Sequence, residues 1–179
     1  VGKKNLIPLK YLDRDISCDY LVIGGGIAGL HAALTLSNSG KKVVLLEKNI
    51  CGGSSSGKSS GFLTPDSELG LSEIIRRFGV KNAKVVWDIP IKGIERILEN
   101  IKKFNIDCDL QKQDSLFLSL GLQGKEEVLE DAKARKKLSF SYKNYSKEEL
   151  KKINTGRGYF SGIRYGNTYG IISLTPLSR

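Results

Sequence analysis

A glycine-rich turn between a short apolar run and an Ala- and Leu-rich stretch most constrains the fold of this chain. Residues 20–23 lead into Gly24-x-Gly26-x-x-Gly29, and helical sequence continues from residue 27 to about residue 38. A strand, a glycine turn and a helix in this order are typical of a dinucleotide-binding unit. Gly24 permits the tight turn, Gly26 lets the backbone approach a pyrophosphate, and Gly29 lets the helix pack close to the strand. The helix N-terminus then offers free N–H groups to the phosphates.

The second half of such a unit follows directly. Gly40 is placed to end the helix, and residues 43–46 (Val-Val-Leu-Leu) indicate a fully buried parallel strand. The strand ends at Glu47, where this fold presents an acid to the ribose hydroxyls of an adenosine. An acid there also argues against a 2′-phosphate, because two negative groups would repel. A lone Glu is more often an ordinary solvated acid, but behind glycines at this spacing we interpret Glu47 as a ribose ligand.

A Gly- and Ser-rich segment comes next and narrows the choice of ligand. Residues 51–63 contain four glycines and five serines. A flexible linker has a similar composition. This segment, however, begins where the second strand ends, at the carboxyl edge of a parallel sheet, and ligands bind at that edge in open α/β folds. Small residues there allow close approach, and hydroxyls with backbone amides can bind an anion.

Together these segments resemble the D-amino-acid-oxidase-like family of FAD-dependent oxidoreductases. The resemblance is strongest over residues 19–65 and continues more faintly to about residue 170. It implies that the glycine turn holds the FAD pyrophosphate, that Glu47 binds the adenosine ribose, and that the Ser56-to-Phe62 loop runs beside the pyrophosphate toward the flavin. Many members have Arg-Asn where this chain has Lys58-Ser59, so only backbone contacts are expected at those two positions. The predicted cofactor-binding residues are Gly24, Gly26, Ile27, Ala28, Gly29, Glu47, Lys48, Ser56, Gly57, Lys58, Ser59, Gly61 and Phe62.

The resemblance also predicts the fold class and domain organisation. It implies an α/β, doubly wound FAD-binding domain of the Rossmann-like, glutathione-reductase type, followed by the start of a mixed α+β substrate domain. We expect an N-terminal extension over 1–18, a dinucleotide-binding core over 19–65, and a helical and substrate-domain portion over 66–179. The chain lacks Met, is about half the family's usual length, and inserts residues 171–175 before Pro176, where the family pattern reaches a Pro sooner. These observations predict an N-terminal fragment, truncated at its C-terminus, whose last ten residues depart from the family pattern.

The middle of the chain has alternating helical and strand patterns. We expect helices over 71–78, closed by Gly79, over 80–88 with Trp87 on the apolar face, and over 91–104 after a break or kink at Pro90. A charged helix over 125–137 and a helix opening at the capping box 146–149 follow. Two strands are expected over 108–110 and 115–120, and short β segments over 156–170.

Composition excludes several classes of function. The net charge of +10 comes without a nucleic-acid recognition motif, so we interpret basic runs such as 133–137 as solvated helix faces. Cys18, Cys51 and Cys108 are odd in number and widely spaced, which argues against a disulfide framework or a metal site. We read them as reduced thiols of a cytoplasmic protein. There is no apolar run long enough for a membrane span.

By resemblance, the expected activity is oxidation of a C–N bond in a small-molecule amine or amino acid, by hydride transfer to the flavin. No catalytic residue is identified. Tyr159, Arg164 and Tyr165 were weighed as ligands of a substrate carboxylate and left unassigned, because such residues more often pack or lie on the surface. His31 on the first helix is expected to be a partly buried structural residue. The alternatives are an NAD-dependent dehydrogenase, against which the Ser56-to-Phe62 loop argues, and a non-catalytic remnant.

Overall fold

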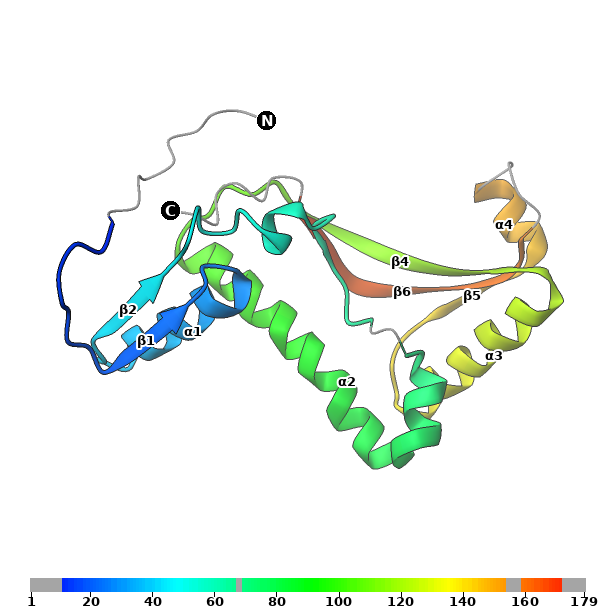
Figure 1. Ribbon diagram of the computed structural model, residues 1–179. Helices are drawn as coiled ribbons and strands as arrows, with labels where there is room; N and C mark the ends of the chain where they lie inside the picture. Colours follow the sequence, from blue (N-terminus) through cyan, green and yellow to red (C-terminus); the bar gives the residue numbers. More distant parts are fainter. Residues whose placement is uncertain (1–10, 67–68, 154–158, 172–179) are drawn as a thin grey trace. The chain divides into compact units, whose positions relative to one another are not determined.

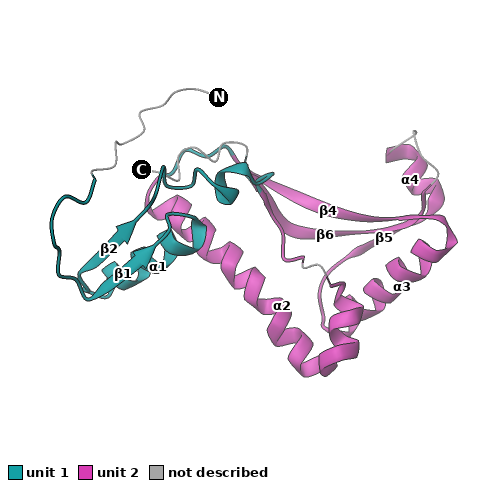
Figure 2. Cartoon of the chain, viewed as in Figure 1, with its two compact units in different colours: residues 1–61, 106–109, 171–179 teal, residues 62–105, 110–170 magenta. Residues whose placement is uncertain are grey.

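The chain divides into two compact units (Figures 1 and 2). The computed structural model describes residues 11–66, 69–153 and 159–171. Unit 1 comprises residues 1–61, 106–109 and 171–179, and unit 2 comprises residues 62–105 and 110–170. Part of the predicted N-terminal extension (1–10) and most of the predicted departure from the family pattern near the C-terminus (172–179) lie outside the described residues.

Unit 1 is built around a β–α–β motif. Strand β1 (Tyr20–Ile23), helix α1 (Ile27–Asn38) and strand β2 (Val43–Leu46) follow one another, and the two strands pair in parallel, with Tyr20 opposite Val43 and Ile23 opposite Leu46. Parallel neighbours need a crossover connection, which α1 supplies. Gly40 has φ 74°, and its N–H donates to the Ser37 carbonyl oxygen at 3.0 Å. The predicted strand, helix and terminating glycine are therefore confirmed.

The burial predicted for β2 is wrong. All four of its residues are only half-buried, and Ile23 of β1 is 81% exposed. Helix α1 has no buried residue, although it is rich in Ala and Leu. The apolar sequence is that of a covered parallel sheet, but within the described part of unit 1 the sheet has two strands and α1 packs against them. The remaining apolar surface of these strands stays accessible.

The longest helix belongs to unit 2. Helix α2 (Leu71–Lys103) changes direction at Gly79, whose φ of 74° and ψ of 164° are not helical. The predicted helix end at Gly79 is confirmed. The predicted interruption at Pro90 is wrong, because the backbone keeps helical φ/ψ through it. Proline removes one helix hydrogen bond, but the apolar side chains of Trp87 and Ile94, one turn on either side, are buried and hold this part of α2 in place.

Two long strands make up most of the unit 2 sheet. Strands β3 (Phe62–Leu63), β6 (Tyr159–Ile171) and β4 (Leu110–Leu120) lie in the order β3-β6-β4, and β5 (Lys143–Tyr145) also pairs with β6. Strands β3 and β5 are both antiparallel to β6. The sequence predicted two short strands where β4 is continuous, and short segments where β6 runs for 13 residues. Polar residues break the apolar pattern of β4, but they pair with β6: Thr168 donates to the Gln113 carbonyl oxygen at 2.9 Å.

Glycines on β6 leave gaps that side chains of β4 occupy. Gly162 and Gly166 lie four residues apart and so share one face of the strand, whereas Asn167, at φ 64°, interrupts the alternation before Gly170. A Cβ on Gly162 would lie 2.9 Å from Leu118, and one on Gly166 would lie 3.3 Å from the Asp114 carboxylate. A Cβ on Gly170 would overlap the Gln113 amide. The contacted residues of β4 move back along the chain as those of β6 advance, so the two strands are antiparallel.

Two further helices complete unit 2. Helix α3 (Gly121–Lys137) begins four residues before the predicted position, directly after β4. Helix α4 (Lys147–Ile153) begins at the predicted capping box. The Glu149 N–H donates to the Ser146 hydroxyl at 3.3 Å, and the Ser146 N–H donates to the Glu149 carboxylate at 2.8 Å. The box thus satisfies two backbone donors at the helix start, as the sequence predicted.

The hydrophobic core among the described residues lies in unit 2. One cluster packs α2 against α3 and the residue that directly follows α3. The other cluster packs α3 against β6. Trp87, predicted on the apolar face, is buried in the first cluster. The two clusters consist of Leu71, Ile74, Ala83, Trp87, Ala134 and Leu138, and of Val128, Ala132 and Ile163.

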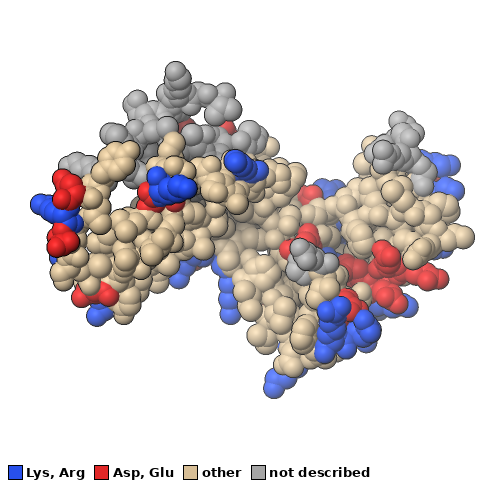
Figure 3. Space-filling view, viewed as in Figure 1, with Lys and Arg blue, Asp and Glu red and all other residues tan. Residues whose placement is uncertain are grey.

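Charged side chains are distributed in small groups. Figure 3 shows basic and acidic side chains in separate patches on the visible face, without a continuous basic surface. Several are paired along α2, where Glu73 binds both Arg76 and Arg77. In the run 133–137, Lys133, Lys136 and Lys137 are exposed as predicted, but Arg135 is only 4% exposed. Its guanidinium is buried among aromatic rings and acids rather than in solvent.

Candidate cofactor site

The glycine turn in unit 1 has a backbone that only glycine accommodates at two positions. Gly24 has φ 101°, in the left-handed region that side chains disfavour, and its N–H donates to the Leu46 carbonyl oxygen at 2.7 Å. A Cβ on Gly29 would overlap the Gly24 carbonyl oxygen. These are the tight turn and the close helix packing that the sequence predicts.

Gly26 differs because the space beside it is open. It precedes α1 in an extended conformation, and a Cβ there would meet only the Ser56 hydroxyl, at 3.4 Å. The Ile27 N–H donates to that same hydroxyl at 3.0 Å. The first turn of α1 contains no acidic residue. The positive end of the helix dipole is therefore not neutralised by its own first turn, which favours an anion at this position.

The middle glycine, Gly25, was not singled out from the sequence, yet it connects the turn to the rest of the site. It is buried, its N–H donates to Glu47 Oε2 at 2.6 Å, and its carbonyl oxygen accepts from the Gly52 N–H at 2.7 Å. A Cβ at this position would lie 2.7 Å from Cys51 Sγ. The third consecutive glycine in Gly24-Gly25-Gly26 was the available signal, because no larger residue fits between Glu47 and Cys51.

Glu47 lies at the end of β2 beside the glycine turn. Its Oε1 accepts from the Asn49 N–H at 2.9 Å, and its Oε2 accepts from the Gly25 N–H. These backbone donors, Asn49 first and then Gly25, hold the pKa of the Glu47 carboxyl below its usual value. The group is therefore ionised at neutral pH. A carboxylate has about four acceptor sites, so Glu47 retains capacity for a ribose hydroxyl.

The Gly- and Ser-rich segment is folded against the glycine turn and does not behave as a linker. It contains a 3₁₀ turn, η1 (Ser55–Lys58), which presents the Ser56 hydroxyl to the start of α1. A Cβ on Gly57 would overlap the Gly52 carbonyl oxygen. Gly61 is buried at φ 78°, receives the Ile171 N–H at 2.9 Å, and donates its own N–H to Ser59 Oγ at 3.2 Å. Close backbone packing explains why small residues recur here.

The structure brings some of the predicted cofactor residues together and leaves others apart. Glu47 and Ser56 contact the glycine turn through the hydrogen bonds given above. Lys48 and Lys58 are exposed. Phe62 is 64% exposed and belongs to unit 2. Glu47, Ser56 and the glycine turn thus form one cluster at the start of α1, and within the described part of the chain the exposed side chains of Lys48, Lys58 and Phe62 have no hydrogen bond to it.

The residues weighed as ligands of a substrate carboxylate do not converge. Arg164 and Tyr165 are consecutive on β6, so their side chains lie on opposite faces of the sheet. Arg164 pairs with Asp114 through Nε at 2.7 Å, whereas the Tyr165 hydroxyl donates to Asp66 at 2.8 Å. One ligand cannot contact both side chains from a single face, and Tyr159 is only half-buried at the start of β6.

Other predicted features of the chain can be placed. His31 is half-buried on α1, and none of Cys18, Cys51 and Cys108 forms a disulfide. Within residues 11–66, 69–153 and 159–171, no group of three His, Cys, Asp or Glu side chains is arranged to bind a metal ion. In the same part of the chain, every helix is too short or too polar to cross a bilayer.

The glycine turn, the acid and the Ser-rich loop coincide with a match to a known family. The model of the FAD dependent oxidoreductase family (DAO) matches residues 19–173. The chain belongs to this family. Its predicted resemblance is thereby confirmed, and so is FAD as the cofactor of the family to which it belongs.

Curated relatives are longer than this chain. It is 34% identical over 153 residues to a "Probable oxidoreductase OrdL" from Haemophilus influenzae, covering 84% of this chain and 35% of the relative. It is also 34% identical over 113 residues to the gamma-glutamylputrescine oxidoreductase of Escherichia coli, covering 63% of this chain and 26% of the relative. The chain therefore spans about a third or less of these relatives.

Solved structures confirm the predicted fold class. The chain superposes on an L-amino acid deaminase from Proteus myxofaciens, in complex with anthranilate, with a TM-score of 0.71 and 16% sequence identity. The match covers 98% of this chain and 37% of the deaminase chain. An L-alpha-glycerophosphate oxidase from Mycoplasma pneumoniae, with FAD bound, matches with a TM-score of 0.64 and 19% sequence identity. This match covers 90% of this chain and 40% of the oxidase chain. The fold is therefore that of α/β FAD-binding oxidoreductases. Because these two enzymes are named for different substrates, the fold alone does not set the substrate class.

Proposed function

We propose that this chain supplies the ADP-binding part and the beginning of the substrate domain of an FAD-dependent oxidoreductase that oxidises a C–N bond in an amine or amino acid. The observation that supports the cofactor-binding role is the glycine turn, which is open beside Gly26 at the start of α1, a helix whose first turn has no acidic residue. The names of relatives support the substrate class, since gamma-glutamylputrescine oxidoreductase, glycine oxidase and amino acid deaminase are among them.

Each proposed ligand has a distinct task. The backbone N–H groups of Ala28 and Gly29, at the start of α1, bind the pyrophosphate, and Ser56, whose hydroxyl accepts from the Ile27 N–H, supplies a further polar group. Glu47 accepts hydrogen bonds from the adenosine ribose and also holds the Gly25 N–H, which keeps the turn in its binding geometry. Backbone groups of the Gly57-to-Gly61 segment line the path toward the flavin. When bound, FAD accepts the hydride, and the protein positions cofactor and substrate.

We also propose that the protein is cytoplasmic and that these 179 residues form only part of the cofactor and substrate sites. None of the three cysteines forms a disulfide, which suits a reducing cytoplasm. The proposed ligands contact the ADP half of FAD, and the chain spans 35% of the relative OrdL. We therefore expect the 179 residues alone to bind FAD weakly and to be inactive, with affinities for ADP and FAD that agree within about threefold, a difference of about 0.7 kcal/mol.

Two measurements test the proposal. Calorimetric titration of the 179-residue chain with ADP, FAD and NAD⁺ should show similar weak binding of ADP and FAD. Submicromolar FAD binding, or turnover by these residues alone, would show that the site extends beyond the ligands proposed here. In the longest natural form that contains this sequence, anaerobic mixing with amines or amino acids should bleach the flavin absorbance. Bleaching by glycerol 3-phosphate or NADH, but by no amine or amino acid, would contradict the substrate class.

A further inference from the structure

A short ladder attaches the end of the proposed cofactor segment to strand β6. Strand β3 has two residues, which pair with Gly170 and Tyr169. Next to this pairing, the Ile171 N–H donates to the Gly61 carbonyl oxygen at 2.9 Å. A ladder of this length supplies few hydrogen bonds, and the Phe62 ring is 64% exposed, so its own packing adds little. The position of Phe62 therefore depends on a further contact.

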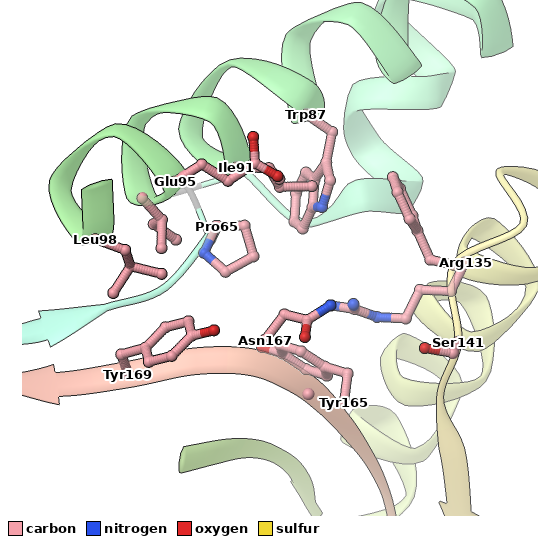
Figure 4. Close-up of a pocket in the computed structure, with 13 residues that line it drawn as sticks. Pro65, Trp87, Ile91, Glu95, Leu98, Arg135, Ser141, Tyr165, Asn167 and Tyr169 are labelled. Carbon is pink, nitrogen blue, oxygen red and sulfur yellow. The ribbon is translucent and has the colours of Figure 1, made fainter. Parts of the chain in front are cut away.

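That contact is a hydrogen bond made three residues after β3. The Tyr165 hydroxyl donates to the two carboxylate oxygens of Asp66, at 2.9 Å and 2.8 Å. Burial, and then the charge of Asp66, raises the pKa of Tyr165, so the hydroxyl keeps its proton and acts as the donor. Pro65 is buried, and Figure 4 shows it between α2 and β6. The connection after β3 is thus held at residues 65 and 66, although the Asp66 side chain is itself 37% exposed.

A buried arginine holds the Tyr165 ring. The Arg135 side chain is 5% exposed, and its Cζ lies 3.6 Å from the centre of the Tyr165 ring and 5.7 Å from that of Trp87. Its Nε donates to Asp131 Oδ2 at 2.7 Å, and its Nη2 lies 4.0 Å from Asp66 Oδ1. Figure 4 shows Arg135 reaching from α3 to Tyr165 on β6. A buried charge with these partners is costly to displace, so Arg135 keeps the ring in place.

We propose that Asp66, Tyr165 and Arg135 form a clamp that fixes β3 on the sheet. The clamp thereby positions Phe62, the last residue of the proposed cofactor segment. This role rests on the proposed function, in which the Gly57-to-Gly61 segment lines the path toward the flavin. The clamp residues are not among the proposed cofactor ligands, so they act through β3 and not by contact with FAD. Their loss should change how the flavin is held and leave binding of the ADP half unaffected.

Amide hydrogen exchange in the 179-residue chain without FAD tests the clamp itself. Tyr165→Phe keeps the ring but removes the hydroxyl donor. It should speed exchange of the Ile171 N–H at least about tenfold, the effect of losing one hydrogen bond to a charged group. The Leu150 N–H of α4 should exchange as in the wild type, which separates release of β3 from general unfolding.

Variants of the acid show whether the same bond is responsible. Asp66→Ala should speed Ile171 exchange as much as Tyr165→Phe does, and the double variant should add nothing further. Asp66→Asn keeps an acceptor oxygen and should retain most of the protection of the Ile171 N–H.

Flavin binding tests the positioning role in the longest natural form that contains this sequence. Tyr165→Phe should weaken FAD binding at least about threefold, because only part of the lost hydrogen-bond energy reaches the cofactor. It should also change the visible circular dichroism of the bound flavin, while ADP binds as it does to the wild type.

Tyr145→Phe is the matched control for both measurements. Tyr145 is also buried, but its hydroxyl accepts from Arg164 at 3.5 Å. The variant should match the wild type in Ile171 exchange and in FAD affinity. Wild-type Ile171 exchange in Tyr165→Phe would overturn the clamp, and faster exchange with unchanged FAD affinity and flavin dichroism would overturn its positioning role. Absence of FAD binding in the wild type would instead contradict the proposed function, and the positioning role with it.

Discussion

The two units differ in how far their apolar side chains are buried. In unit 1, Ile23 is 81% exposed and α1 buries no residue, whereas in unit 2 Leu71 and Ile163 are completely buried. The conformation of unit 1 instead depends on backbone geometry, with Gly24 at positive φ and Gly25 bonded on both sides. Unit 1 is therefore specified mainly by hydrogen bonds and close glycine contacts. Unit 2 is specified mainly by packing.

This difference predicts where each kind of substitution has its effect. Removing apolar volume should affect unit 2 strongly and unit 1 weakly, because the free energy lost depends on the burial of the deleted atoms. Adding atoms at glycines should affect unit 1 strongly, because its turn is closed by backbone contacts.

The largest expected effect is on the core of unit 2. Trp87→Ala should lower the free energy of unfolding of unit 2 by about 3–5 kcal/mol, since it empties a buried site. Ile23→Ala is the counterpart in unit 1 and should change stability by no more than about 0.5 kcal/mol. Urea unfolding followed by circular dichroism measures both. If Ile23→Ala lowered the free energy of unfolding by more than about 1 kcal/mol, β1 would be covered in solution. The two units would then not differ in burial as described here.

The second effect separates the two kinds of glycine within the turn. Gly26→Val should weaken ADP binding about 100-fold, through loss of two or three hydrogen bonds to the pyrophosphate, while the fold is kept, because its Cβ meets only Ser56. Gly29→Ala should disturb the turn itself, because its Cβ overlaps the Gly24 carbonyl oxygen. Calorimetry with ADP and amide chemical shifts measure the two outcomes.

Gly93 of α2 supplies the control for these glycine variants. A Cβ there meets nothing within 4 Å, so Gly93→Ala should stabilise α2 by up to about 1 kcal/mol and leave ADP binding unchanged. Wild-type ADP affinity in Gly26→Val would remove the glycine turn from the pyrophosphate site.

A third prediction tests the ribose role of Glu47. Glu47→Ala should weaken FAD binding by about 1.5–3 kcal/mol, the range for a hydrogen bond to a charged group. The flavin spectrum at saturation should not change. Because Glu47 also holds the Gly25 N–H, comparison of ADP with 2′,3′-dideoxy-ADP separates the two roles. The wild type should prefer ADP, and Glu47→Ala should bind both nucleotides equally. A preference for ADP that survives the substitution would assign the ribose to another group.

The smallest effect concerns two acids whose pKa values are lowered by different causes. Hydrogen bonds from Arg76 and Arg77 lower the pKa of Glu73 to about 2, and the backbone N–H groups of Asn49 and Gly25 lower the pKa of Glu47. Both folded pKa values lie below the usual glutamate pKa of 4.5, so the stabilisation is present above that pH and is lost as the pH falls through the folded pKa.

Carboxyl NMR titrations at low and high salt measure this difference. Salt should raise the Glu73 pKa more than that of Glu47, because charged partners are screened and fixed backbone donors are screened less. Equal salt dependence would show that charge, rather than the backbone, sets the state of Glu47.

Local signals explain the parts of the fold that the sequence predicts. The glycine turn, the end of the first helix segment at Gly79 and the capping box at Ser146 each depend on residues a few positions apart. The candidate cofactor residues rest on the same kind of signal, because Gly24, Gly29 and Glu47 sit at fixed spacing around one turn.

Features that depend on partners distant in sequence were not predicted. The continuity of β4 and β6 arises from pairing across about fifty residues, and the helix through Pro90 is held by packing. Burial of Arg135 inside a charged helix needs the rings and acids of other elements. The Gly25 contacts depend on Cys51 and Gly52, which approach only after β2 has paired with β1.

The glycine gaps of β6 also bear on how the chain finds its fold. Ser119 meets Ser161 across 42 residues and Thr168 meets Gln113 across 55, so β4 and β6 must locate each other over long loops. A slip of one residue turns every side chain to the wrong face. A slip of two residues sets Arg164 or Thr168, in place of a glycine, beneath the side chains of β4. Side-chain volume therefore disfavours the misaligned pairs, so the spacing of Gly162 and Gly166 favours one alignment during folding.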